Sequence, residues 1–138
     1  MTIKEKEDEL IETFDELEDW ENRYTFLLDL GRDLTPYPEK LKTPDRKIEG
    51  CQSNVWLDAE RTDDGRVVFR ADADSLIVRG LVSMLIDVFS GHTPDEILAD
   101  DLSFINRMGL GQQLSPTRSN GLLAMIKQMR AYALAFKG

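Results

Sequence analysis

Apolar residues recur with the period of a helix through the first part of the chain. They form two stripes, which predict one helix over residues 1–18 and a second from Trp20 to about Gly31. The stripes consist of Leu10, Ile11, Phe14 and Leu17, followed by Trp20, Tyr24, Leu27 and Leu28. Asp19 can cap the second helix, and a glycine such as Gly31 is typical of a helix C-terminus.

The middle of the chain changes to the alternating pattern of strands. Two runs, Val55 to Arg61 and Arg66 to Ala73, predict an antiparallel hairpin, because the Asp63-Asp64-Gly65 sequence between them favours a tight turn. Ile48 extends this pattern as a short strand before the hairpin. Residues 35–47 hold three of the five prolines and are predicted to form a long loop.

The remaining sequence is helical in its pattern. Residues 76–89 are apolar on most sides and predict a central buried helix that Asp74 and Ser75 can cap. Three further helices are predicted after Gly91, and their start signals are the Thr93-Pro94-Asp95-Glu96 capping box, Asp101 or Ser103, and Ser115-Pro116-Thr117. The elements together predict an α+β fold, with a small antiparallel sheet packed against several helices.

Size and charge limit the classes of function. A chain of 138 residues with 41% hydrophobic and 31% charged residues is expected to form a single domain over residues 1–138. The net charge is −9, of which residues 1–21 carry −8, so an acidic N-terminal helix (1–18) precedes a nearly neutral body (20–138). This composition argues against nucleic-acid binding. The acidic run is either a solvated helix face or a steering surface for a basic partner.

No apolar run is long enough to span a bilayer, and the acidic start does not fit a signal or transit peptide. Cys51 is the only cysteine, so it has no disulfide partner within the chain, and a cytoplasmic location is expected. One cysteine and one histidine are too few for a closed zinc or iron–sulfur site. His92 lies in a turn sequence and is interpreted as an ordinary surface residue.

The surroundings of Cys51 indicate a loop at the entrance to a strand. Gly50 gives the backbone freedom before the thiol, while Gln52 and Ser53 are polar. A thiol in such a loop is either an inert packing residue or a reactive group that can meet another protein's sulfur. Reactivity requires the thiolate, so a cation is expected nearby, and Arg46, Lys47 and Arg118 are the candidates.

The segment Gly50-Cys51-Gln52-Ser53-Asn54-Val55-Trp56 resembles the active loop of the SufE family of sulfur acceptors. Three more segments resemble that family in the expected order. They are Trp20-Glu21-Asn22-Arg23-Tyr24, Arg79-Gly80-Leu81, and Leu114 through Leu122. The resemblance implies the α+β fold that the SufE family shares with IscU-type scaffolds. Those scaffolds hold a nascent cluster on three cysteines, whereas this chain has one.

The resemblance also implies a function. Cys51 would receive persulfide sulfur from a pyridoxal-phosphate cysteine desulfurase of the SufS or CsdA type, stimulate that enzyme, and pass the sulfur to an iron–sulfur scaffold complex of the SufBCD type. The chain would need no cofactor of its own. Gly50, Gln52, Ser53, Asp74 and Arg118 are the candidates for loop and partner contacts. Arg118 is hypothesised to hold the anionic sulfur or the partner, and Asp74 has helix capping as its alternative.

Two other functions stay open from the residues alone. The chain could be an interaction module in which Cys51 is incidental, or a redox-sensing thiol protein. The sequence does not determine which desulfurase paralogue is the partner, or whether the protein is a homodimer.

Overall fold

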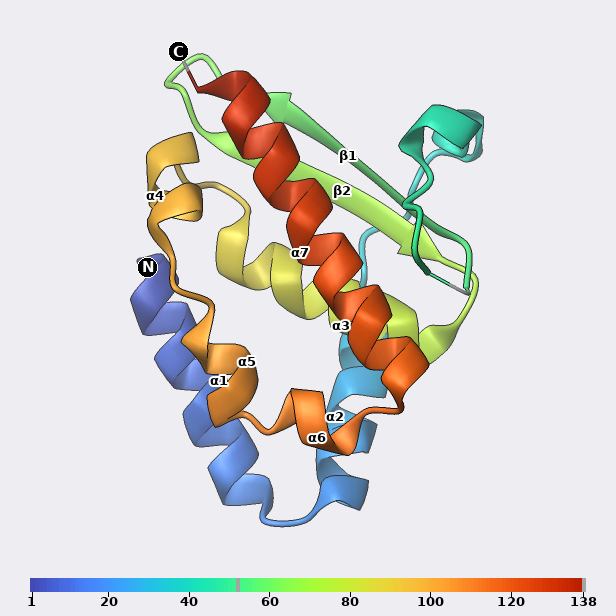
Figure 1. Ribbon diagram of the computed structural model, residues 1–138, viewed down its shortest axis with the longest axis vertical. Helices are drawn as coiled ribbons and strands as arrows, with labels where there is room; N and C mark the ends of the chain where they lie inside the picture. The colour runs from blue at the N-terminus through green and yellow to red at the C-terminus, as the bar shows by residue number, and fades with distance from the viewer. Residues whose placement is uncertain (52, 138) are drawn as a thin grey trace.

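The computed structural model describes residues 1–51 and 53–137, and Figure 1 shows the arrangement of its helices around one β-hairpin. The elements in chain order are α1 (Ile3–Leu17), α2 (Trp20–Arg32), the 3₁₀ turns η1 (Glu39–Leu41) and η2 (Pro44–Arg46), β1 (Val55–Arg61), β2 (Val67–Ala73), α3 (Leu76–Phe89), α4 (Pro94–Ala99), α5 (Ser103–Arg107), α6 (Leu110–Gln113) and α7 (Pro116–Phe136). The predicted α+β fold is confirmed. None of the helices in these described ranges is both long and apolar enough to cross a membrane.

The hairpin buries one of its faces. β1 and β2 pair in antiparallel register from Val55–Ala73 to Arg61–Val67, and alternate residues such as Leu57 and Phe69 are buried against α3 and α7. The predicted strand at Ile48 is reduced to an isolated bridge between Lys47 and Trp56. The chain before the cysteine is therefore fixed to the outer edge of β1.

The other face of the hairpin carries charges and is joined to the loop at residues 35–47. Lys42 forms an ion pair with Asp72 at 3.0 Å, and Arg46 approaches Asp58 at 3.5 Å. Asp58 also accepts two hydrogen bonds from Arg70, at 3.0 and 3.2 Å. These pairs and two 3₁₀ turns anchor the loop that was predicted for residues 35–47.

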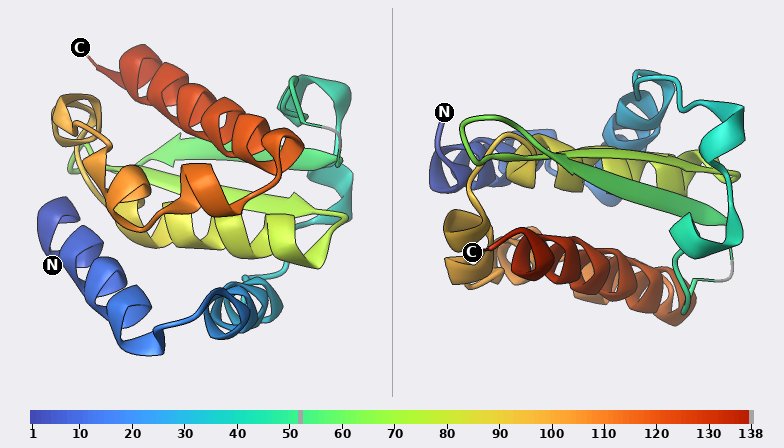
Figure 2. Two further views of the ribbon diagram at one scale, coloured as in Figure 1. Left: turned by 60° about the horizontal axis from the view of Figure 1, so that its bottom comes forward. Right: turned by 90° about the horizontal axis from the view of Figure 1, so that it is seen from above.

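Helix α3 is the centre of the structure, as its apolar sequence predicted. It lies between α2 on one side and the hairpin and α7 on the other (Figure 2). Two glycines allow α2 and α3 to approach closely, because a Cβ on Gly80 would collide with the carbonyl of Leu27, and one on Gly31 would lie 2.6 Å from the carbonyl oxygen of Leu76. Gly31 was predicted to end α2, but the helix continues to Arg32, and its role is this contact.

The region after α3 contains the element that the sequence pattern missed. Thr93 forms the predicted capping box with Glu96. The four-residue α6 was not predicted, because it is too short to show a helical period, and it follows Gly109 in a left-handed conformation (φ +75°). Ser75 occupies the N-cap position of α3 but makes no capping hydrogen bond there.

Substituting alanine for Gly80 should destabilise the protein strongly, because the added methyl must displace the backbone of α2. Overpacking of this kind costs about 1–3 kcal/mol, and more where the neighbour is backbone. Gly111→Ala is the matched control: the nearest atom to its new Cβ lies 4.0 Å away, so this variant should be as stable as the wild type or more so. Urea denaturation measures both, and equal midpoints for the two variants would contradict the close-contact account.

A buried acid connects α1 with the segment after α4. Glu7 is 1% exposed, and its carboxyl group lies against that of Asp100. Burial, together with the hydrogen bond to Asp100, raises the pKa of Glu7 from 4.5 to about 8. Glu7 is therefore protonated at neutral pH and can donate a hydrogen bond to Asp100.

This raised pKa gives stability a defined pH dependence. The folded state holds a proton on Glu7 that the unfolded chain releases above pH 4.5, so the free energy of unfolding should fall as the pH rises from 4.5 to about 8 and change little above that. Glu7→Gln keeps a donor that cannot ionise, so its stability advantage over the wild type should be larger at pH 9 than at pH 5. Glu12→Gln, at an exposed site on the same helix, is the control. A Glu7→Gln effect that is the same at both pH values would argue against the shared proton.

Candidate functional site

Cys51 lies on a short loop that is closed at its base. The backbone N–H of Ile48 donates to the carbonyl of Val55 at 2.8 Å, so Cys51 lies between two points that this hydrogen bond joins. Gly50 has φ +91°, a left-handed conformation that residues with a Cβ rarely adopt. The predicted freedom at Gly50 is used to turn the thiol inward, toward α7.

The thiol rests half-buried against the second turn of α7. Its Sγ atom donates to the carbonyl oxygen of Gly121 at 3.7 Å. Burial raises the pKa of Cys51 above its usual value of 9.0. Both the desolvation and the hydrogen bond favour the protonated form, so the resting thiol is a weak nucleophile.

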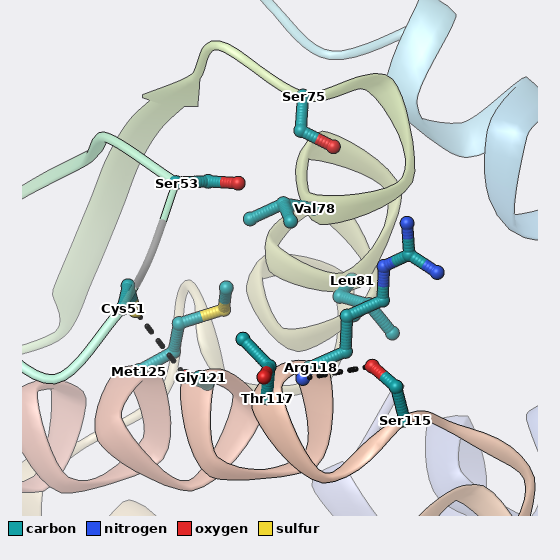
Figure 3. Close-up of a pocket in the computed structure, with 10 residues that line it drawn as sticks. All are labelled: Cys51, Ser53, Ser75, Val78, Leu81, Ser115, Thr117, Arg118, Gly121 and Met125. Atoms are coloured by element: carbon teal, nitrogen blue, oxygen red, sulfur yellow. Dashed lines mark hydrogen bonds between the residues drawn. The ribbon is translucent and has the colours of Figure 1, made fainter.

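A cavity of about 310 Å³ adjoins the sulfur atom (Figure 3). The side chains around it come from the Cys51 loop, from the start of α3 and from the first half of α7. They are Cys51, Ser53, Ser75, Val78, Leu81, Ser115, Thr117, Arg118, Gly121 and Met125. The floor of the cavity is apolar, because Val78, Leu81 and Met125 are buried, while its rim carries hydroxyl groups.

The cations expected near the thiol do not reach it in this conformation. Arg46 is engaged with Asp58, and Lys47 is exposed. Arg118 lines the cavity, but its guanidinium group lies on the side away from Cys51 (Figure 3). The first residues of α7 also line the cavity, with Ser115 as the N-cap that accepts from the backbone of Arg118 at 3.3 Å. A sulfur anion in the cavity would therefore find positive charge that the resting thiol does not.

Asp74 holds the far end of the Cys51 loop. Its carboxylate accepts hydrogen bonds from the backbone N–H of Asn54 at 3.2 Å and from the side-chain amide of Asn54 at 2.9 Å. The backbone N–H of Asp74 donates in return to the carbonyl of Asn54 at 3.1 Å. The helix-capping alternative for Asp74 is wrong, because its side chain binds the loop and leaves the N-terminus of α3 free.

The structure brings together most of the residues that the sequence singled out. Cys51, Ser53 and Arg118 line one cavity, Gly50 packs near Ala124 beside it, and Asp74 anchors the loop from outside. Gln52 lies outside the described residues.

Several lining residues were not predicted as site residues from the sequence. Val78, Leu81 and Met125 were assigned to the core, and Ser75, Ser115 and Thr117 were assigned to the starts of helices. Gly121 gave a usable signal, because a glycine inside a helix costs about 1 kcal/mol relative to alanine and often marks a close approach. Here it is Cys51 that approaches: a Cβ on Gly121 would lie 3.6 Å from Sγ.

Other chemistry is not assembled in the described part of the chain. His92 is not the exposed residue that its turn sequence suggested, because its side chain is 13% exposed and its backbone pairs with Val67. No group of three His, Cys, Asp or Glu side chains in residues 1–51 and 53–137 is placed to hold a metal ion.

Fold and site together define a small α+β domain that shelters one loop thiol against its last helix. The sequence profile described as "SufE: Fe-S metabolism associated domain" matches residues 8–133, so the chain belongs to the SufE family. This membership confirms the resemblance noted in the sequence and connects the chain with iron–sulfur metabolism.

Individual relatives agree with this assignment. An uncharacterised SufE-like protein of Rhizobium meliloti (strain 1021) is 38% identical over 130 residues, which cover 91% of this chain and 93% of that protein. The solution structure of a hypothetical protein from Thermus thermophilus superposes with a TM-score of 0.77 over 95% of each chain. At 21% identity, the second comparison shows a shared fold.

Removing the Asp74 carboxylate should make Cys51 more reactive. The two hydrogen bonds to Asn54 contribute about 1 kcal/mol each, so their loss should favour an open loop by up to roughly thirtyfold. We expect Asp74→Ala to be alkylated by iodoacetamide faster than the wild type at pH 8, as followed by mass spectrometry. Asp63→Ala removes an exposed carboxylate from the hairpin turn and should react like the wild type. Equal rates for all three proteins would show that Asp74 does not hold the loop closed.

Proposed function

We propose that this protein is a cytoplasmic sulfur carrier that accepts a persulfide sulfur on Cys51 from a pyridoxal-phosphate cysteine desulfurase. The observation that carries the proposal is the position of Cys51, the only thiol of a SufE-family chain, on a loop beside a preformed cavity. The pyridoxal phosphate belongs to the desulfurase. The carrier contributes the Cys51 thiol and a cavity that can hold the persulfide.

The transfer is a displacement at sulfur. The thiolate of Cys51 attacks the outer sulfur of the donor's cysteine persulfide, a new bond forms to that sulfur, and the donor cysteine leaves as a thiolate. No electron acceptor is needed, because the persulfide is exchanged between two cysteines. The single cysteine supports this role, since the chain has no second thiol to resolve the persulfide internally.

The cavity suits the product. A sulfur–sulfur bond is about 2 Å long, and a water molecule occupies about 30 Å³ in the liquid, so about 310 Å³ easily accommodates one added sulfur atom. Persulfide sulfur placed there would be shielded from solvent oxidants and reductants. Arg118 and the N-terminus of α7 are the positive groups that could stabilise its charge.

The resting geometry implies an order of events. A protonated thiol that faces inward must turn out and ionise before it can attack, so docking of the desulfurase should open the loop. Relief of the donor persulfide then frees the desulfurase for another turnover, which is the proposed stimulation. The sulfur is next passed to an iron–sulfur scaffold complex. The raised pKa argues against the alternative of a redox-sensing thiol, because such sensors depend on thiolate character and exposure.

Intact-mass spectrometry tests the proposal directly. The protein is incubated with a SufS-type cysteine desulfurase and free cysteine, without a reductant, beside a Cys51→Ser control. We expect the wild type to gain at least one sulfur atom that a thiol reductant removes, and the control to gain none. Cys51→Ser differs in one atom, so a comparable circular dichroism spectrum confirms that the control is folded.

Two results would contradict the proposed carrier function. If the wild type gains no sulfur from desulfurases of both the SufS and the CsdA type, the carrier function is wrong. If Cys51→Ser still binds a desulfurase and stimulates it fully, the interaction module is the better description.

A further inference from the structure

The carbonyl of Gly121 fixes where the resting sulfur lies along α7. Inside a helix this carbonyl accepts a hydrogen bond from the backbone N–H four residues later, which is that of Met125. The Sγ atom of Cys51 donates to the same oxygen at 3.7 Å, so the thiol lies over the turn between Gly121 and Met125. A Cβ on Gly121 would lie 3.6 Å from Sγ, so the missing side chain leaves this space to the sulfur.

The side chain of Met125 extends toward the same place. Side chains of an α-helix lean toward its N-terminus, so Met125 covers the turn on which the thiol rests. It lines the cavity together with Cys51 and is only 1% exposed. In Figure 3 its sulfur atom points into the cavity, where Val78 and Leu81 form the opposite wall. Met125 thus brings a second sulfur atom next to the reactive one.

An added sulfur atom has one open direction. Sγ is attached to its loop on one side and contacts the backbone of α7 on another, so the outer sulfur of a persulfide extends into the cavity. A sulfur–sulfur bond is about 2 Å long, which is less than half of a helical turn. The outer sulfur therefore stays over the same turn of α7 and meets the side chain of Met125 before it reaches Thr117, one turn away.

We propose that Met125 is the residue that receives the outer sulfur of the Cys51 persulfide and holds it in the cavity by direct contact with its thioether. The inference rests on the proposed function, and it assigns a persulfide-binding role to a residue whose sequence pattern indicated only core packing. Met125 belongs to α7, whereas Cys51 belongs to the loop. The contact therefore exists only while the loop is closed.

A methionine suits this position for two physical reasons. Its side chain is unbranched and has three rotatable bonds, so the thioether can shift to admit one more atom without a movement of the backbone. Sulfur is also highly polarizable, which strengthens the dispersion contact between the thioether and the outer sulfur. The aliphatic residues of the cavity floor, Val78 and Leu81, are branched and contain no sulfur.

This contact protects the stored sulfur from thiols. The thiolate of a reductant attacks the outer sulfur, a new sulfur–sulfur bond forms, and Cys51 leaves as a thiolate. Such an attack comes from the side opposite to Sγ, in line with the bond that breaks. In the closed cavity Met125 lies on that side, so the loss of its thioether should expose the persulfide without changing the unloaded thiol.

Methyl NMR observes the contact directly. The chain has five methionines, so ¹³C-methyl methionine labelling gives one signal for each, and Met125→Leu identifies the signal of Met125. Cys51 is loaded with glutathione persulfide, which transfers its outer sulfur to the Cys51 thiolate and leaves as glutathione thiolate, and mass spectrometry confirms the added sulfur. We expect the Met125 signal to move on loading and to return after reduction. The signal of Met129, which is also 1% exposed and lies one turn further along α7, should stay in place.

Kinetics separate this contact from ordinary packing. Met125→Leu keeps an apolar side chain of similar volume, a kind of change that cores tolerate well. We expect the loaded variant to lose its sulfur to dithiothreitol several-fold faster than the wild type, while its unloaded thiol reacts with iodoacetamide at the wild-type rate. Met129→Leu is the matched control and should equal the wild type in both assays. If Met125→Leu changes both rates by the same factor, Met125 only packs the loop and the inference is wrong.

The chemical donor also separates this inference from the proposed function. If no desulfurase loads the wild type, the carrier function fails, while glutathione persulfide still shows where an added sulfur lies. If the loaded protein leaves the Met125 signal unmoved, this inference fails and the carrier function stands. A wild type that gains no sulfur from either source would contradict both.

Discussion

The close contact between α2 and α3 is the constraint on which the rest of the structure depends. Gly31 and Gly80 let the two helices approach until the backbone of one meets the backbone of the other, so α3 has almost no freedom to shift. The first turns of α3 supply Val78 and Leu81 to the sulfur cavity, and Asp74 just before α3 holds Asn54. The two glycines thus help to set the position of the helix that forms one wall of the cavity.

The site shelters the thiol, whereas the proposed function requires an exposed one. In the closed loop, burial and the carbonyl of Gly121 keep the sulfur protonated, which protects it from oxidation but also slows its attack on a persulfide. The two hydrogen bonds between Asp74 and Asn54 contribute about 2 kcal/mol together, an amount that a protein partner's contact energy can readily offset. Under the proposed function, a loop held by such weak interactions would stay closed in the free protein and open on docking, which would confine reactivity to the complex.

Local signals in the sequence predicted most elements, and long-range contacts account for the failures. The hairpin, the helix at residues 76–89 and the capping box at Thr93 follow from turn, period and cap residues that lie within a few positions of one another. Gly31 was misinterpreted because its role depends on Leu76, which is distant in sequence. At the site, the loop residues identified Cys51, but only the fold could show that Gly121 receives the thiol and that Arg118 points away from it.

The attachment of the acidic N-terminal helix to the body decides where its negative charge lies. If residues 1–21 were a loose tail, their charge would not be confined to one end of the molecule. The buried residues of α1, Glu7 among them, instead fix the helix to the body, at the end away from Cys51. An exposed charge is largely screened by physiological salt beyond about 8 Å, so the acidic helix has little electrostatic effect on the thiol at the other end of the molecule. Glu7 therefore contributes by its burial, which holds α1 in place and keeps the acidic end apart from the end that carries the cysteine.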